Sequence, residues 1–254
     1  MELDRKLIEC VANAAEGITV DQVVIGLGYT AVTTSNGGMG LAATGAAMHG
    51  CCGSLDVEDF ESRPAGDLLA GIGSADPMNR TMALALINAL NHEAALRLPQ
   101  DPGNDVLLDR FDVLGGARVA MVGYFPPLVR LLESKGVPFS VIDDARGIGD
   151  KDHFYRQLRD WADVLLMTAT SIINQTTESI LAHAGPDMRT ILLGPSTPMV
   201  AAAFTHLPIH MLAGTAITDR MQALKIVRHG GGARSLKPVS RKVYQETGIG
   251  RSLE

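Results

Sequence analysis

The chain has 254 residues, of which 46% are hydrophobic but only 4% aromatic, so aliphatic side chains must build the core of one or two domains. The 22 basic and 28 acidic residues give a net charge of −6, which argues against a nucleic acid or an anionic membrane surface as partner. No apolar run reaches the ~20 residues of a membrane span, and the segment MELDRKLIEC carries both charge signs and a helical pattern, unlike a signal peptide. Three cysteines form no disulfide framework, so we expect a cytoplasmic protein with reduced thiols.

The first half of the chain indicates a helix followed by a small β-meander. Apolar residues at helical spacing predict a helix over residues 3–14. Three β-rich segments follow, at residues 20–25, 29–34 and 39–44. Asn36-Gly37 lies between the last two and predicts a hairpin tip, because both residue types tolerate positive φ. The glycines of this region either serve turns or let a ligand or another backbone approach closely, at positions 26, 28, 37, 38, 40 and 45.

His49, Cys51 and Cys52 form a candidate metal-ligand cluster after the meander. Thiolate and imidazole groups suit a soft transition-metal ion, which is the cofactor that this cluster would hold. The spacing is not that of a zinc site, since the chain contains no C-x-x-C motif. The alternative interpretation is a tight loop with small buried side chains, because free cysteine packs as a small apolar group.

A turn-rich stretch, PQDPGND at residues 99–105, marks the best domain boundary. It follows a helix that should begin at Asp76-Pro77 and run to about Leu98. We therefore expect an α+β domain over residues 1–105 and a second domain over residues 106–254.

The second domain alternates apolar strands with helices. Residues 118–132 predict the opening unit: the apolar strand VAMV, then Gly123, then a helix that begins at Pro126-Pro127. Further strands are expected at residues 139–142, 163–167, 191–193 and 209–212. This alternation predicts a doubly wound α/β parallel sheet of five or more strands, with Val119–Val122 and Ile191–Leu193 central. An alanine-rich helix should follow Pro198, and the tail from Ala233 has weak periodicity, typical of a surface extension.

Ligands of such sheets bind outside the carboxyl ends of the strands. The candidate ligand-binding residues in the loops after the strands are Gly123, Tyr124, Thr168, Thr170, Ser171, Asn174, Gly194, Pro195, Ser196 and Thr197. These loops carry hydroxyls, amides and glycines but no lysine or arginine, so they suit a polar small molecule better than a polyphosphate. We expect them to converge on one pocket, roofed by the meander or the Cys51 loop. No hydroxyl has a base beside it in the sequence, so no catalytic residue is assigned.

Nucleotide binding has little support at the same loops. The turn after residues 119–122 has one glycine where dinucleotide binders use three, and two prolines remove amide donors. Asp143 ends the second strand, where an acidic residue either holds ribose hydroxyls or caps a turn. Without the glycine motif, the capping interpretation is favoured.

Three motifs together resemble a bacterial and archaeal family of heavy-metal-chelation proteins. They are the glycine-rich meander from Ile25 to Gly45, the loop DVLLMTATSIINQT at residues 163–176, and LGPSTP at residues 193–198. The resemblance covers nearly the whole chain, and GPSTP is its most specific part. It implies a domain like the enolase N-terminal domain, a Rossmann-like domain after it, and a site in the cleft between them. It implies no enolase activity, because the acidic ligands of an enolase barrel have no counterpart here.

Two functional hypotheses follow. In the first, the protein binds a metal ion, or a metal-associated small polar ligand, in the interdomain cleft. In the second, it is an enzyme that acts on a small polar metabolite, with or without a nucleotide-type cofactor. Both involve a small-molecule or metal ligand and neither involves nucleic acid or a membrane; a homo-oligomer is compatible with either.

Overall fold

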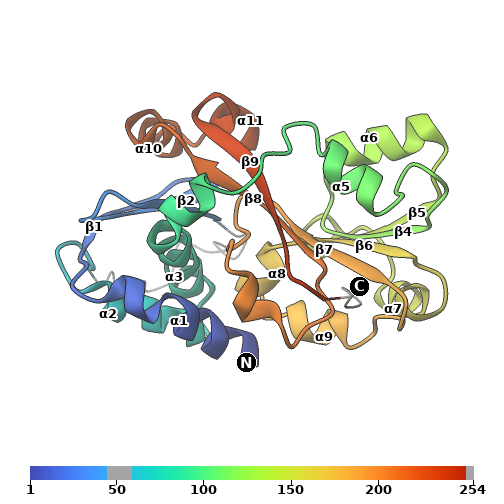
Figure 1. Ribbon diagram of the computed structural model, residues 1–254, viewed down its shortest axis with the longest axis horizontal. Helices are drawn as coiled ribbons and strands as arrows, with labels where there is room; N and C mark the ends of the chain where they lie inside the picture. The colour runs from blue at the N-terminus through green and yellow to red at the C-terminus, as the bar shows by residue number, and fades with distance from the viewer. Residues whose placement is uncertain (45–58, 250–254) are drawn as a thin grey trace.

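The computed structural model describes residues 1–44 and 59–249, and these form a mixed α/β fold with two sheets (Figure 1). One sheet is small and antiparallel, in the order β1-β2-β3. The other has six strands in the order β5-β4-β6-β7-β8-β9, and all but β9 are parallel. Within the described ranges, no helix has both the length and the apolar character that crossing a bilayer requires.

The described residues of the first half form eight elements: the predicted helix and three strands, a second predicted helix with one break, and two short elements, at residues 65–69 and 70–73, that the pattern did not predict. They are α1 (Glu2–Ala15), β1 (Val20–Ile25), β2 (Tyr29–Thr34), β3 (Met39–Ala43), α2 (Ala65–Leu69), the 3-10 turn η1 (Ala70–Gly73), α3 (Pro77–Leu90) and α4 (His92–Leu96). Asp76 caps α3 by accepting hydrogen bonds from the amides of Met78 and Asn79, at 2.7 and 2.9 Å. The predicted single helix to Leu98 is wrong, because Asn91 leaves the helical conformation at φ −95°, ψ 8°.

The three-stranded sheet is covered on both faces, so all six residues of β2 are buried. Val32 packs with α1 and α3 in one core cluster, whereas its neighbour Ala31 packs with Leu224 and Val227 of α10 in another. Successive side chains of a strand point to opposite faces, which assigns the two helices to opposite sides of this sheet. The helix α10 comes from far along the chain, so this arrangement ties the two halves together.

The second half builds the six-stranded sheet. Its elements are α5 (Asp105–Arg110), β4 (Val119–Val122), α6 (Pro126–Lys135), β5 (Phe139–Ile142), η2 (Asp144–Arg146), α7 (Lys151–Asp160), β6 (Val164–Thr168), α8 (Thr170–Ile173), α9 (Thr177–Leu181), β7 (Arg189–Leu193), η3 (Ala201–Phe204), β8 (Met211–Ile217), α10 (Arg220–Arg228), α11 (Ala233–Leu236), η4 (Lys237–Val239) and β9 (Ser240–Glu246). The predicted parallel sheet is confirmed, with β4 and β7 inside it.

Two expectations for the last third of the chain are wrong. The tail after Ala233 is not a surface extension: β9 pairs antiparallel with β8 along seven residues. The sequence of β9 lacks the apolar pattern of a strand, because β9 is an edge strand and only its Val243 is buried. The alanine-rich segment after Pro198 forms the single 3-10 turn η3 instead of a helix.

Replacing Gly37 by valine should lower the free energy of unfolding by about 1 kcal/mol or more, because Gly37 has φ +91°, which a β-branched residue adopts only with strain. Urea denaturation monitored by circular dichroism measures this. Gly73→Val is the control, since its added Cβ meets nothing within 4 Å and its φ is not in the positive region. Equal stability of Gly37→Val and the parent protein would refute the argument.

Candidate functional site

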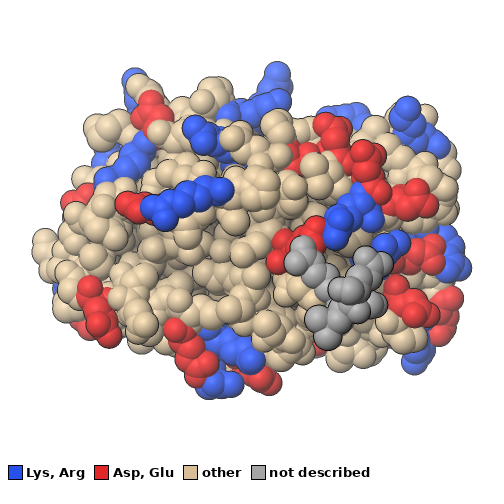
Figure 2. All heavy atoms as spheres, in the orientation of Figure 1, with Lys and Arg blue, Asp and Glu red and all other residues tan. Residues whose placement is uncertain are grey.

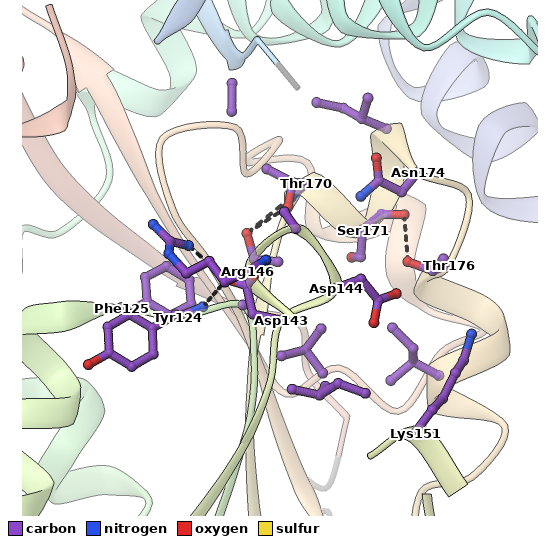
Figure 3. Close-up of a pocket in the computed structure, with 18 of the residues that line it drawn as sticks. Tyr124, Phe125, Asp143, Asp144, Arg146, Lys151, Thr170, Ser171, Asn174 and Thr176 are labelled. Carbon is purple, nitrogen blue, oxygen red and sulfur yellow. Dashed lines mark hydrogen bonds and ion pairs between the residues drawn. The ribbon is translucent and has the colours of Figure 1, made fainter. Parts of the chain in front are cut away.

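A cavity of about 690 Å³ opens at the carboxyl ends of β4, β5 and β6 (Figure 3). The chain passes from β4 to β5 on one side of the sheet and then returns to place β6 on the other side of β4. The direction of winding therefore reverses between β4 and β6. In open α/β sheets, the crevice at this reversal is where ligands bind.

Residues from the small sheet complete the wall. Tyr29, Ala43 and Thr44 line the cavity together with the strand ends of the larger sheet. Burial raises the pKa of the Tyr29 phenol. The cavity is thus bounded by both halves of the chain.

Six of the residues singled out from the sequence line this cavity: Gly123, Tyr124, Thr168, Thr170, Ser171 and Asn174. The Thr168 and Thr170 hydroxyls lie 3.0 Å apart and bond each other. Ser171 is buried, and its hydroxyl is 2.8 Å from that of Thr177, so it serves the packing of α8 on α9. Asn174 is exposed, and its side-chain amide makes no hydrogen bond with the described residues and is available to a ligand.

The candidate loop after β7 does not contribute to this cavity. The described residues that line the cavity include none of this loop's residues, which are Gly194, Pro195, Ser196 and Thr197. The Ser196 hydroxyl accepts a hydrogen bond from the Ala43 amide at 2.8 Å, and its carbonyl accepts one from Asn88 at 3.3 Å. Ser196 and Thr197 are both buried. This loop joins the larger sheet to β3 and α3, so its polar groups form hydrogen bonds within the protein.

The loop after β5 supplies charged residues to the wall, and none of them is among the candidate ligand-binding residues. Asp143 accepts hydrogen bonds from the Tyr124 amide at 2.8 Å, the Arg146 amide at 3.1 Å and the Arg146 guanidinium at 2.7 Å. Both carboxylate oxygens are therefore engaged, and the capping interpretation describes Asp143. The loop after β5 follows a parallel strand, so the rule that ligands bind at the carboxyl ends of such strands selects it as well.

Two cations enter this wall from the segment after β5, which was not among the candidate loops that lack lysine and arginine. The Arg146 guanidinium lies 5.6 Å from the centre of the Tyr124 ring, and the Lys151 ammonium lies 5.8 Å from that of Tyr155. Asp144 adds a carboxylate that makes no hydrogen bond within the described residues. Figure 3 shows Lys151, Asp144 and Asn174 on one side of the cavity and Arg146 on the other.

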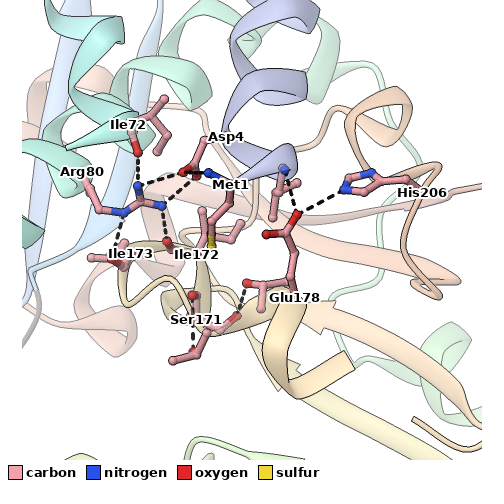
Figure 4. Close-up of polar contacts among 12 residues, drawn as sticks. Met1, Asp4, Ile72, Arg80, Ser171, Ile172, Ile173, Glu178 and His206 are labelled. Carbon is pink, nitrogen blue, oxygen red and sulfur yellow. Dashed lines mark hydrogen bonds and ion pairs between the residues drawn. The ribbon is translucent and has the colours of Figure 1, made fainter. Parts of the chain in front are cut away.

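Thr176 is the residue before α9, and the polar groups at this helix make contacts other than a helix cap. The Thr176 side chain makes no capping bond; its hydroxyl donates instead to the Ser171 carbonyl at 3.5 Å. Glu178 accepts a hydrogen bond from the Leu3 amide at 3.0 Å, and His206 Nε2 lies 3.5 Å from the same carboxylate (Figure 4). These contacts tie α9 to the start of α1.

A buried arginine anchors the helix that carries Thr170 and Ser171. Arg80 of α3 donates to the carbonyls of Ile173 and Ile172 at the end of α8, at 3.0 and 2.7 Å (Figure 4). It also forms an ion pair with Asp4 at 2.8 Å, and its side chain is only 1% exposed. One wall of the cavity is therefore fixed to the N-terminal half by charge-assisted bonds.

A metal centre is not evident among the described residues, which contain no group of three or more His, Cys, Asp or Glu side chains placed to hold an ion. His49, Cys51 and Cys52 lie outside the described residues. Thr44, which precedes His49 by five positions, lines the cavity.

The fold and the cavity define an α/β protein with a polar crevice at a sheet switch point. A family model described as "Putative heavy-metal chelation" (DUF364) matches residues 106–246, and a second model with the same description (DUF4213) matches residues 8–91. The chain belongs to this family. An uncharacterised protein of Methanocaldococcus jannaschii is 26% identical over 185 residues, 68% of each chain.

Two solved structures share the fold. A DUF364-family protein of unknown function from Pyrococcus horikoshii superposes with a TM-score of 0.80 and 22% identity, covering 97% of this chain and all of the other. A second, from Desulfitobacterium hafniense, has a TM-score of 0.72 and 21% identity, covering 95% and 98%. At these identities the likeness concerns the fold alone.

Proposed function

We propose that the protein binds a small organic acid, free or as its complex with a metal ion, in the cavity at the carboxyl ends of β4, β5 and β6. The observation that carries this proposal is a wall that combines Arg146 and Lys151 with uncharged hydrogen-bonding groups. The volume of about 690 Å³ lies in the range of small-molecule sites. Organic acids that chelate metals present several carboxylates, which such a wall can match.

The roles of the wall residues follow from the hydrogen-bonding capacity that remains to their polar groups. Lys151 can pair with a carboxylate as a mobile point charge, and Arg146 has nitrogens beyond the one bound to Asp143. Asn174 and Thr170 supply an amide and a hydroxyl that fix the ligand's orientation. The carboxylate of Asp144 would repel a second bound acid group unless a cation bridges the two, which favours a metal-loaded ligand.

The division of the chain near residue 105 supports this proposal, because the two family models match on either side of it. The wall takes Tyr29 and Thr44 from the first part and the strand ends from the second. On this proposal the site lies between two domains, and the His49, Cys51 and Cys52 side chains are soft ligands within a short length of chain from Thr44.

Lys151→Gln/Asn174→Ala should reduce the affinity for citrate, and for citrate with Zn²⁺, by at least about tenfold, because each lost contact to a charged group is worth about 1.5 kcal/mol or more. Isothermal titration calorimetry measures this, after organic and elemental mass spectrometry of the purified protein. Arg156→Gln, an exposed residue of the same helix that does not line the cavity, is the control. Absence of any retained acid or metal, together with no binding of mono-, di- or tricarboxylates with or without Zn²⁺, would contradict the proposal.

Cys51→Ser/Cys52→Ser should lower the affinity for Cu(I) or Cd(II) at least tenfold while leaving Ca²⁺ binding weak in both proteins, because thiolates select soft ions. Competition with a chromophoric chelator provides the measurement. Cys10→Ser is the matched control, since Cys10 is an exposed cysteine on α1. Unchanged soft-metal affinity in the double variant would remove these residues from the proposed function.

The enzymatic hypothesis uses the same cavity and makes a different prediction for the ligand. An enzyme converts the ligand on incubation, whereas a binding protein releases it unchanged. Mass spectrometry of a retained ligand before and after incubation therefore separates the two hypotheses.

A further inference from the structure

The segment from α10 to β9 carries a concentration of positive charge that the net charge of the chain conceals. Between Asp219 and Glu246 the sequence contains no acidic residue and seven basic ones: Arg220, Lys225, Arg228, Arg234, Lys237, Arg241 and Lys242. The chain as a whole has a net charge of −6. In Figure 2, lysine and arginine side chains gather along the upper edge of the molecule, where Figure 1 places α10 and α11.

Most of this charge is not neutralised inside the fold. Arg220 lies 3.5 Å from Asp21, and Lys242 donates to Asn104 at 2.9 Å. Arg228 bonds only the neutral side chain of Gln22, at 3.0 Å. Five exposed cations form no ion pair within residues 1–44 and 59–249, and we call them the basic face: Lys225, Arg228, Arg234, Lys237 and Arg241.

Exposed apolar side chains border the basic face. Leu27, at the turn between β1 and β2, is 88% exposed, and Met221 in the first turn of α10 is 75% exposed. With Ile25 they make three of the five exposed large hydrophobic residues in the described chain. Most of the apolar area of these side chains is left in contact with water, which is unfavourable.

The apolar and basic groups belong to one continuous surface. Met221, Lys225 and Arg228 lie at i, i+4 and i+7, so they form one exposed stripe on α10, beside the face that buries Ala223, Leu224 and Val227. At the other end of this helix, Leu27 Cδ1 lies 3.1 Å from where a Cβ on Gly230 would be. The β1–β2 turn therefore lies directly against the end of α10, beside Arg228.

We propose that this surface binds the anionic face of a lipid bilayer, with Leu27 and Met221 inserted among the headgroups and the basic face against acidic lipids. Basic residues near such a surface each contribute about fivefold to binding. Nucleic acid fits less well, because residues 220–243 contain no phenylalanine, tyrosine or tryptophan for stacking and an apolar tip gains nothing against phosphates. The expectation against an anionic membrane rested on the net charge of the whole chain. That net charge does not reveal the local excess of basic residues in this segment.

Sedimentation of the full-length protein with vesicles tests the proposal. The protein should bind vesicles of phosphatidylcholine with 30% phosphatidylglycerol at low salt, bind pure phosphatidylcholine vesicles at least tenfold more weakly, and dissociate as salt is raised. Lys225→Glu/Arg228→Glu should weaken binding by about 25-fold or more. Leu27→Ser/Met221→Ser should weaken it several-fold at unchanged salt dependence.

Arg130→Glu/Arg156→Glu is the matched control, because it makes the same charge change at exposed positions of α6 and α7, away from the basic face. It should retain at least half of the binding. The proposal fails if the control loses as much binding as Lys225→Glu/Arg228→Glu, if vesicles of the two compositions bind equally, or if duplex DNA binds more tightly than the anionic vesicles.

Discussion

Replacing Arg80 by methionine should lower the free energy of unfolding by about 3–5 kcal/mol, the cost of breaking a buried ion pair by removing one partner. The side chain of Arg80 is 1% exposed, and its guanidinium donates twice to Asp4 and to the carbonyls of Ile72, Ile172 and Ile173. Methionine fills much of the volume but leaves these acceptors buried without donors. Each unsatisfied group carries its own desolvation cost.

Guanidinium-induced unfolding monitored by circular dichroism gives this free energy. Arg97→Met is the control, because the Arg97 pair with Glu93 is 78% and 81% exposed and contributes less than about 1 kcal/mol. Adding Asp4→Asn to Arg80→Met should recover part of the loss, since the remaining buried group is then neutral. A loss below about 1 kcal/mol for Arg80→Met would show that water replaces the guanidinium and that Arg80 does not anchor α8.

Gly40→Ala should destabilise the protein by about 3 kcal/mol, although it adds a single methyl group. The helix α3 crosses β3 so closely that a Cβ on Gly40 would overlap the Ala85 carbonyl oxygen and the Ala89 amide nitrogen. Both obstacles are backbone atoms of the helix, so no side chain can rotate away. The helix must move off the sheet, and the Asn88 bonds to Leu41 and Ser196 lengthen with it.

Thermal unfolding measures the effect, and Gly66→Ala provides the contrast. Gly66 lies in α2, and a Cβ there meets nothing within 4 Å, so alanine should be neutral or stabilising by up to about 1 kcal/mol. Equal melting temperatures for Gly40→Ala and the parent protein would mean that α3 moves freely over β3, contrary to the packing described here.

Local chemistry was enough to predict the three strands of the small sheet and the five parallel strands of the larger one, but not the antiparallel β9. Residues 119–122 and 139–142 are short runs bounded by turn formers, and β4 and β5 have these bounds. Asn36-Gly37 predicted the hairpin because the positive φ of Gly37 depends on the residue type and not on distant partners. The rule that ligands bind at the carboxyl ends of parallel strands then selected six of the residues that line the cavity.

The rule that ligands bind at the carboxyl ends of parallel strands applies equally to every loop, so it could not show which loops line the cavity. Strand order decides which of them border the switch point, and it places the β4, β5 and β6 ends there. The β7 loop, with Ser196 and Thr197, lies farther along the sheet and is occupied by contacts with β3 and α3. Arg146 and Lys151 belong to the wall for the same topological reason, although the only ligand signal near them in the sequence, Asp143 at the strand end, serves as a turn cap.

The sequence by itself determined the features that depend on neighbouring residues: apolar runs, caps, turns and the alternation that makes a parallel sheet. Only the tertiary structure decided which polar groups meet, because their partners are distant in the chain. Asp4 and Arg80 are 76 positions apart, and Ala43 and Ser196 are 153 apart. A buried charge or an edge strand such as β9 is stable only when its partner is in place, and no local pattern records that partner.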